Sequence, residues 1–130
     1  ISNIYSAFEL IIDRDADYKN IVAFTMASDN VWCAGVILGN PIENWKNIDF
    51  NTLKSTLYWN DETPQEAIIK DANPFDTLAW VINLRLSLNL NIPKGSKIIT
   101  GSVIKTRSPK KGDVVTYNVG NLSETKIRLI

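Results

Sequence analysis

The sequence predicts an α+β fold that consists mainly of β-strands and contains one clear helix. Several short segments are rich in β-branched and aromatic residues and are separated by turn residues, which is typical of strands. One longer segment, from residue 74 to about 88, carries apolar residues at helical spacing instead. No repeat, low-complexity run or linker divides the chain, so we expect residues 1–130 to form a single domain.

The first half of the chain predicts strands joined by turns. Residues 5–13 are dense in aromatic and β-branched side chains and predict a buried strand. Residues 22–38 are mostly apolar, but their periodicity does not distinguish helix from strand, and Gly39-Asn40-Pro41 is expected to end this stretch. Residues 53–59 alternate in the manner of a strand, and the turn-like residues after them predict a hairpin with residues 65–69.

The predicted helix has recognisable start signals. Pro74 suits the first helical position, and Asn73 can cap the helix. The residues that follow helical spacing are Phe75, Leu78, Ala79, Ile82 and Leu86. Trp80 is placed on the apolar face and is expected to lie in the core.

The remaining segments again predict strands. Residues 97–100 are expected to form a short strand that ends at Gly101. Residues 114–119 and 125–130 predict a final hairpin about Gly120-Asn121.

Composition excludes several classes of function. The chain has 14 Lys plus Arg and 14 Asp plus Glu, so a net charge of zero gives no electrostatic reason to expect nucleic acid or an anionic membrane as partner. The absence of histidine excludes a Ser-His-Asp triad, a Cys-His pair and a histidine metal site within this chain. A lone cysteine, Cys33, and the absence of a visible secretory leader suit a reducing compartment, so we expect a cytoplasmic protein.

Three stretches of the chain carry a resemblance to known enzymes. The first is AFELIIDR at residues 7–14, followed by Ser28-Asp29-Asn30 and by GVILG at residues 35–39. The second is NPFDTLAWVIN at residues 73–83. The third is IPKGSKIITGSV at residues 92–103, followed by Lys111-Gly112-Asp113 and the final hairpin. In this order and spacing they resemble the C-terminal part of the 2-keto-4-pentenoate hydratase and 4-oxalocrotonate decarboxylase family, within the fumarylacetoacetate hydrolase superfamily.

The resemblance implies a mixed β-roll fold and a metal-dependent lyase that acts on 2-oxo or 2-hydroxy-dienoate acids. It implies Mg²⁺ or Mn²⁺ as the cofactor, a small 2-oxo acid as the substrate and a homo-oligomeric assembly. Hydration of a 2-keto-4-pentenoate-like substrate is the activity that we expect, and a 4-oxalocrotonate-type decarboxylase is the first alternative. An acylpyruvase-like hydrolase of carbon–carbon bonds and a non-catalytic scaffold subunit are the other two.

The resemblance also assigns candidate site residues. Glu9 corresponds to one of three carboxylate metal ligands, and carboxylates suit a hard divalent cation. From the residues alone, Glu9 could equally lie on the solvent face of an edge strand. The family's other two ligands form a Glu-x-Glu pair upstream, which this sequence does not contain before Glu9, so we expect a C-terminal part of a longer enzyme, a partner chain that supplies the pair, or an inactive chain.

The remaining candidates are substrate-binding and catalytic residues. Thr100-Gly101-Ser102 corresponds to the family's turn for the substrate carboxylate, although an ordinary strand-end turn would look the same. Asp29 and Asn30 match a catalytic pair, and a turn or capping role explains them equally well. Arg14 is expected to bind a carboxylate of the substrate or to form a surface salt bridge. The family's small hydroxyl residues are replaced here by Val31-Trp32-Cys33, so Trp32 is expected to narrow or fill the pocket and Cys33 to be a buried small hydrophobe.

Overall fold

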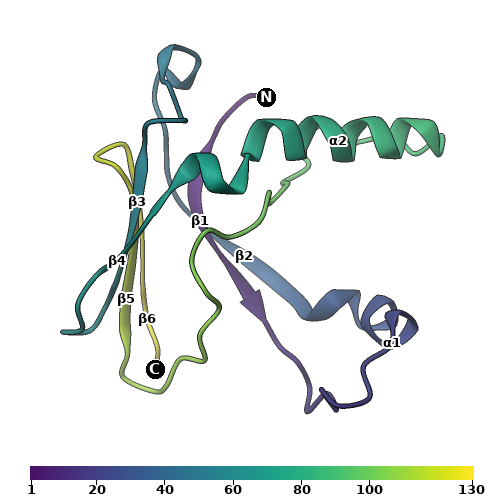
Figure 1. Ribbon diagram of the computed structural model, residues 1–130, viewed down its shortest axis with the longest axis horizontal. Helices are drawn as coiled ribbons and strands as arrows, with labels where there is room; N and C mark the ends of the chain where they lie inside the picture. Colours follow the sequence, from purple (N-terminus) through teal and green to yellow (C-terminus); the bar gives the residue numbers. More distant parts are fainter.

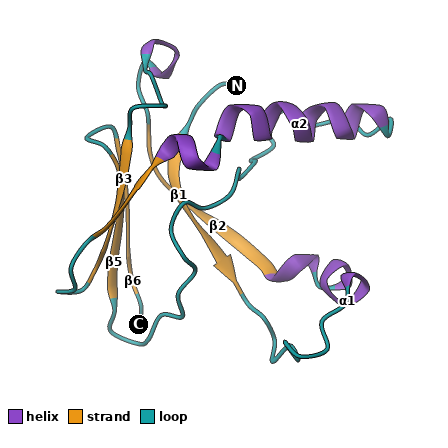
Figure 2. Ribbon diagram, in the orientation of Figure 1, coloured by secondary structure: helices purple, strands orange, loops and turns teal.

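The computed structural model describes residues 1–130 and shows two antiparallel sheets with one long helix (Figures 1 and 2). A two-stranded sheet contains β1 and β2, and a four-stranded sheet has the strand order β4-β3-β5-β6. The predicted α+β class with mainly strands is confirmed, whereas the mixed β-roll stays a prediction. No helix combines the length and the apolar character that crossing a lipid bilayer requires.

The β1–β2 hairpin resolves the segment whose periodicity was ambiguous. Strand β1 spans Tyr5–Ile11, two residues shorter than predicted. After it, the short helix α1 (Ala23–Ser28) and the 3-10 turn η1 (Asn30–Trp32) precede β2 (Cys33–Pro41). The apolar stretch is therefore helix first and strand second. Gly39-Asn40-Pro41 ends the stretch as expected, since β2 ends at Pro41, which pairs with Tyr5.

The four-stranded sheet confirms both predicted hairpins. Strand β3 (Lys54–Trp59) pairs with β4 (Gln65–Ile68) on one side and with β5 (Val114–Val119) on the other, and β5 pairs with β6 (Ser123–Arg128). In β3 the alternation of the sequence becomes an alternation of burial, because Ser55 and Leu57 face inward. Gly120 supports the turn between β5 and β6 with a positive φ of 51°.

Helix α2 spans Pro74–Ser87 and confirms the predicted helix, but two details differ. Asn73 occupies the cap position in a left-handed conformation, and its side-chain amide donates to the Asp76 carboxylate at 3.0 Å instead of accepting a helix N–H. Trp80 is 64% exposed, so its expected place in the core is wrong. The helix contacts the core through Phe75 in its first turn, and the centre of this ring lies 5.2 Å from that of Phe50. The rest of the helix projects away from the sheets (Figure 1).

Residues 88–113 connect α2 to β5 without a helix or strand. The short strand predicted at residues 97–100 is wrong, because no neighbouring strand pairs with this segment and a strand depends on such pairing. Arg107 anchors the segment to the four-stranded sheet: its guanidinium donates two hydrogen bonds of 2.8 and 2.9 Å to Glu62 and stacks 4.2 Å from the centre of the Trp59 ring.

A seam of buried hydroxyl groups joins the two sheets. Ser6 on β1 hydrogen-bonds to Ser123 at 2.8 Å and to Thr125 at 2.6 Å, both on β6. The Ser6 N–H also donates to the Ser123 hydroxyl at 3.0 Å. Gly39 on β2 lies against the same place, since a side chain there would overlap atoms of Ser6, Thr125 and the Glu124 carbonyl group. Polar contacts and close backbone approach therefore hold the hairpin to β6, and the Phe8 ring on β1 also packs against the Tyr117 ring on β5, with the ring centres 6.0 Å apart.

The apolar core lies beside the four-stranded sheet. Its buried cluster consists of Ile42, Phe50 and Val119, with partly buried residues such as Trp45 and Tyr117 around it. Leu57 and Val115 are buried within the sheet itself. Only 9 of 130 residues are buried, so the core supports the sheet and leaves α1 and most of α2 outside it.

Candidate functional site

Glu9 lies near the end of β1 with its side chain exposed to solvent. It stands opposite Val36, and the Cys33 thiol at the start of β2 is its hydrogen-bonding neighbour. The Glu9 carboxylate raises the pKa of Cys33 through this hydrogen bond, and desolvation raises it further. Cys33 is only partly buried, rather than buried as expected, and its thiol stays protonated at neutral pH, which excludes a thiolate nucleophile there.

A small pocket of about 260 Å³ forms where β1 ends and α1 begins. Arg14 and Asp29 meet in it as an ion pair, which is the salt-bridge arrangement considered for Arg14. Trp32 forms one wall, and its ring packs edge-on against Tyr18 with the ring centres 5.5 Å apart. The complete lining is Asp13, Arg14, Ala16, Asp17, Asn20, Ile21, Thr25, Asp29 and Trp32.

The turn that positions Trp32 has an unusual backbone. Asn30, Val31 and Trp32 have positive φ angles of 50°, 50° and 62°, and this region is unfavourable for branched and bulky side chains. Each such residue costs about 1–3 kcal/mol and persists only when its surroundings hold it. Three hydrogen bonds do so here: the Trp32 N–H donates to the Asp29 carbonyl at 2.8 Å, the Ile12 N–H to the Trp32 carbonyl at 2.9 Å, and the Asn30 amide to the Cys33 carbonyl at 3.1 Å.

The structure therefore brings together Arg14, Asp29 and Trp32, with Asn30 in the turn that supports them. The sequence drew attention to Asp13 only as the neighbour of Arg14 and did not identify Tyr18. The Tyr18 hydroxyl donates to the Asp13 carboxylate at 2.6 Å, and this hydrogen bond raises the pKa of Tyr18. The density of acidic residues after β1 was the available signal, but it looked like an ordinary loop.

The turn Thr100-Gly101-Ser102 is not part of the Arg14–Asp29 pocket. Gly101 has a φ of 102°, which an L-residue rarely adopts, and no atom lies within 4 Å of a side chain built there. The glycine is thus required by the conformation of the turn and not by a close approach. The Ser102 hydroxyl accepts from the Ile104 N–H at 3.2 Å and donates to the Ile104 carbonyl at 2.5 Å, so it stabilises its own turn.

The residues of this chain do not by themselves fit the metal site that the resemblance implies. No group of three or more acidic, cysteine or histidine side chains lies close enough together to hold a cation. Glu9 has the Cys33 thiol as its neighbour, and a protonated thiol is a poor ligand for Mg²⁺ or Mn²⁺. Glu9 is accessible, but two further carboxylates would have to come from outside the described residues.

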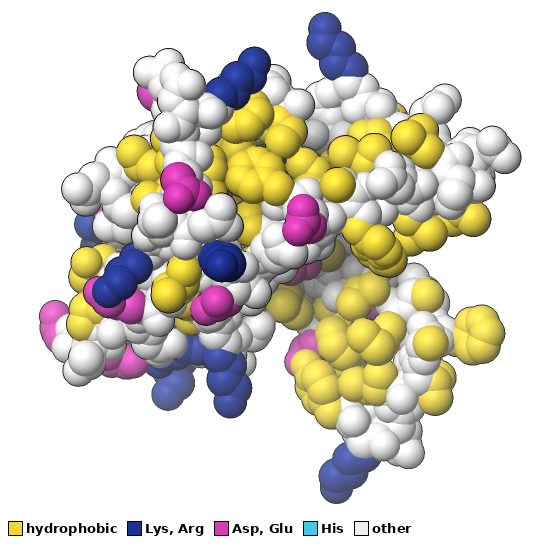
Figure 3. Space-filling view, turned by 45° about the horizontal axis from the view of Figure 1, so that its top comes forward, with side chains coloured by type: hydrophobic (Ala, Val, Ile, Leu, Met, Phe, Trp, Pro, Cys, Tyr) yellow, Lys and Arg dark blue, Asp and Glu magenta, His cyan; other side chains and the backbone are white.

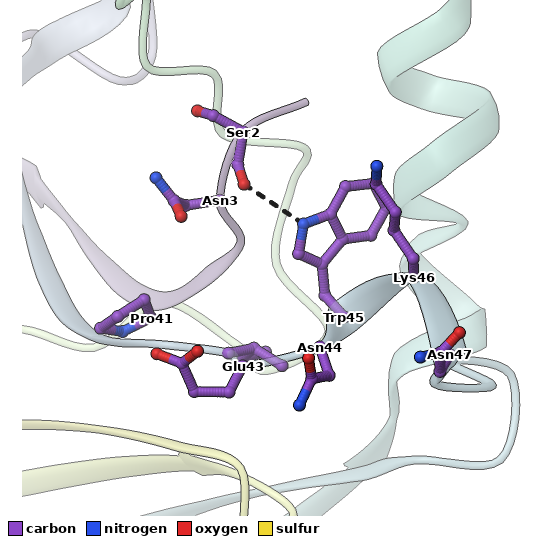
Figure 4. A pocket seen from close by; sticks show the side chains of 9 residues that line it. Ser2, Asn3, Pro41, Glu43, Asn44, Trp45, Lys46 and Asn47 are labelled. Carbon is purple, nitrogen blue, oxygen red and sulfur yellow. Dashed lines mark hydrogen bonds between the residues drawn. The ribbon is translucent and has the colours of Figure 1, made fainter.

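A second cavity, of about 350 Å³, lies where the chain leaves β2, next to the first residues (Figure 4). Its lining is mostly polar and consists of Ser2, Asn3, Pro41, Ile42, Glu43, Asn44, Trp45, Lys46 and Asn47. The Trp45 indole N–H donates to the Ser2 carbonyl at 3.3 Å and closes one side. None of the predicted site residues lines this cavity.

Comparison with known proteins is consistent with the resemblance in the sequence. No family model matches the chain. It is 27% identical to a 2-oxo-hept-4-ene-1,7-dioate hydratase of Escherichia coli over 143 aligned residues, which cover 98% of this chain and 53% of that enzyme. It is 23% identical to a 4-oxalocrotonate decarboxylase of Pseudomonas putida over 140 aligned residues, which cover 100% of this chain and 52% of that enzyme. The chain spans about half the length of these curated relatives, and what it resembles along that half is a hydratase and a decarboxylase.

Proposed function

We propose that this chain is the C-terminal catalytic part of a metal-dependent lyase that acts on 2-oxo acids. The observation that carries the proposal is the similarity to two enzymes of this kind along essentially the whole chain. The reaction that we assign is hydration of a 2-keto-4-pentenoate-like dienoate, in which water adds its hydroxyl group to one carbon of a double bond and a proton to another. The protein is proposed to form homo-oligomers.

The pocket beside β1 supplies the chemistry for binding an acidic substrate. Arg14 uses one terminal nitrogen for Asp29, and its guanidinium has five N–H donors, so donors remain for a carboxylate. Asp29 holds the guanidinium in place. Trp32 bounds the pocket and limits the length of chain that fits beside Arg14. A change of Trp32 to a smaller residue is therefore expected to admit longer substrates.

Glu9 is proposed as one metal ligand, with Mg²⁺ or Mn²⁺ as the cation. Such a cation, if held there together with carboxylates from elsewhere, would supply Lewis-acid chemistry to a bound 2-oxo acid. Glu9 contributes an exposed carboxylate on a strand, and the strand fixes its direction. Thr100-Gly101-Ser102 remains the proposed carboxylate-binding turn, through the backbone N–H groups that Gly101 allows to face a ligand.

Two observations favour alternatives. The similarity to a decarboxylase favours loss of CO₂ from a 2-oxo acid as a second candidate reaction of the same site. The absence of a complete cation-binding cluster favours a scaffold subunit that retains the fold. The two reactions differ in product, since only decarboxylation releases CO₂.

A metal and ligand titration tests the proposal. In the longest polypeptide that contains this chain, Mn²⁺ binding, followed by electron paramagnetic resonance, should weaken at least several-fold in Glu9→Gln and stay unchanged in Glu124→Gln, which alters an exposed glutamate on β6. Oxalate, a 2-oxo acid mimic, should bind more weakly to Arg14→Ala than to the unmodified chain in the presence of Mn²⁺. Equal Mn²⁺ affinity in both glutamate variants would show that Glu9 is not a metal ligand. Oxalate binding that is unaffected by Arg14→Ala would show that the pocket containing Arg14 does not bind the substrate carboxylate.

The reaction itself is tested with a conjugated 2-hydroxy-dienoate. Hydration removes the ultraviolet absorbance of the diene without releasing CO₂, whereas decarboxylation of an oxalocrotonate-like substrate releases one CO₂ per turnover. The assay is made with the longest polypeptide that contains this chain. Absence of both reactions in that protein, together with intact folding by circular dichroism, would support the scaffold alternative.

A further inference from the structure

The pocket beside β1 lies between two parts of the chain. One side is the loop between β1 and α1 (Figure 1), and the other consists of Thr25 on α1, Asp29 and Trp32. The ion pair of Arg14 with Asp29 joins the two sides. A second link is the contact between the Tyr18 and Trp32 rings, whose centres are 5.5 Å apart and whose planes meet at 61°. One wall of the pocket is therefore a ring that Tyr18 contacts from the opposite side of the loop.

Tyr18 is fixed in place although it is 62% exposed. Its hydroxyl donates to the Asp13 carboxylate at 2.6 Å, and this hydrogen bond raises the pKa of Tyr18. The backbone around it is fixed as well, because the Asp17 carboxylate accepts from the Lys19 N–H at 3.0 Å and from the Asn20 side-chain amide at 2.6 Å. An exposed side chain without such contacts changes rotamer freely. These hydrogen bonds therefore hold the Tyr18 ring in one position.

Trp32 needs support because its backbone is strained. It ends a run of three residues with positive φ angles, which valine and tryptophan rarely adopt. Conformations of this kind persist only where their surroundings hold them. The hydrogen bonds of the turn hold the backbone, and the edge-on contact with Tyr18 holds the side chain. Loss of that contact would leave the Trp32 ring free to turn away from the pocket.

We propose that Tyr18 is a positioning residue that determines which chain lengths the pocket accepts, because it holds the Trp32 ring in place. Tyr18 does not line the pocket, so it acts through Trp32 and not on the substrate. This inference rests on the proposed function, since it takes the pocket as the site of a 2-oxo acid bound beside Arg14. It adds a residue that selects among such acids without binding them.

Binding of two 2-oxo acids that differ only in chain length tests this role. The affinities for 2-oxobutanoate and 2-oxooctanoate are measured by isothermal titration calorimetry in the presence of Mn²⁺, with the longest polypeptide that contains this chain. The unmodified protein should prefer the shorter acid. Tyr18→Leu should reduce this preference by about 3- to 10-fold, the factor that corresponds to one aromatic contact. Tyr18→Phe keeps the ring but loses the hydrogen bond to Asp13, so its preference should lie between the two.

The matched control is Tyr58→Leu, because Tyr58 is an exposed tyrosine on β3 that does not line this pocket. It should leave the preference unchanged. A double variant separates positioning of Trp32 from a general loosening of the loop. Once Trp32→Ala has removed the wall, Tyr18→Leu should cause no further loss of preference, because two residues that act through one contact have non-additive effects. Circular dichroism confirms that all variants fold.

A Tyr18→Leu variant with the preference of the unmodified protein overturns the inference. So does a Tyr18→Phe variant that loses as much preference as Tyr18→Leu, because the ring contact would then have no role. Additive effects of Tyr18→Leu and Trp32→Ala overturn it as well.

The variant Arg14→Ala distinguishes these failures from a failure of the proposed function. It should weaken the binding of both acids. Unchanged binding of both acids in Arg14→Ala would reject the proposed site and this inference with it. Weaker binding in Arg14→Ala together with an unchanged preference in Tyr18→Leu would reject this inference alone.

Discussion

Gly39 offers the sharpest test of how the two sheets are joined. A β-carbon at this position would lie under 3.0 Å from the Glu124 carbonyl oxygen, the Thr125 hydroxyl and the Ser6 hydroxyl, a separation that real β-carbons essentially never show. One of the three is a backbone atom and the other two belong to a buried hydrogen-bonded network. Gly39→Ala must therefore move β2 away from β6 by about 1 Å to reach ordinary contact distances.

The cost follows from two contributions. Overfilling a packed site costs about 1–3 kcal/mol. Separation of the strands also stretches the hydrogen bonds that Ser6 makes with Ser123 and Thr125, at about 1 kcal/mol for each bond that is lost. We expect a loss of about 3–5 kcal/mol, a large part of the roughly 5–15 kcal/mol that stabilises a typical domain.

Urea unfolding followed by tryptophan fluorescence measures this loss as a shift of the midpoint by about 1 M or more. Gly35→Ala on the same strand is the matched control, because a β-carbon there would meet only the Leu10 side chain, at 4.0 Å. That variant should remain within about 1 kcal/mol of the unmodified chain, with stabilisation the expected direction. Equal midpoints for the two variants would refute the close approach of β2 to β6.

Three further changes probe the same framework. Ser123→Ala leaves the buried Ser6 N–H without its acceptor and should lower the free energy of unfolding by about 1–3 kcal/mol in the same urea assay. Hydrogen bonds lower the pKa of Asp113 in the folded state, mainly the one from the Asn60 side chain and next the one from the backbone. The ionised carboxylate therefore stabilises the fold above the ordinary carboxyl pKa of about 4. This stability is lost as the pH falls through the lower pKa of the folded state. The stability difference between the unmodified chain and Asp113→Asn, measured by urea unfolding from pH 7 to pH 2, should therefore narrow at acid pH, and a difference independent of pH would contradict this role. Arg107→Lys removes a planar two-point contact and a stacking contact, so limited proteolysis within residues 98–108 should become faster while β6 stays uncut.

The sequence predicted the elements whose local signals agree with their surroundings. Alternation in β3, turn residues around Gly120 and the Asn73-Pro74 start of α2 each predicted an element that the structure contains. Each of these signals depends only on residues that are close together in the sequence, so the sequence alone is enough to detect it. Where a segment needs a distant partner, the prediction failed, as for residues 97–100, which have strand-like side chains but no adjacent strand.

The candidate site was only partly predictable for the same reason. The pairing of Arg14 with Asp29 joins residues on either side of α1, and the sequence named both as candidates without a way to place them in contact. The left-handed turn that orients Trp32 could not be foreseen, because valine and tryptophan rarely adopt positive φ angles. Thr100-Gly101-Ser102 does not line this pocket. The route of the backbone through the fold places the turn elsewhere, and the residue types alone do not show that route.

The sequence by itself determined the mixture of strands and one long helix, the absence of histidine chemistry and the likeness to hydratases and decarboxylases. These properties depend on composition, periodicity and the order of short motifs. Only the tertiary structure decided that Trp80 is exposed, that hydroxyl groups join the two sheets, and that many apolar side chains on and around α1 and α2 lie on the surface (Figure 3). The physical reason is that an apolar side chain is buried only when another part of the protein covers it. The pattern of residues along one segment does not show which other part, if any, does so.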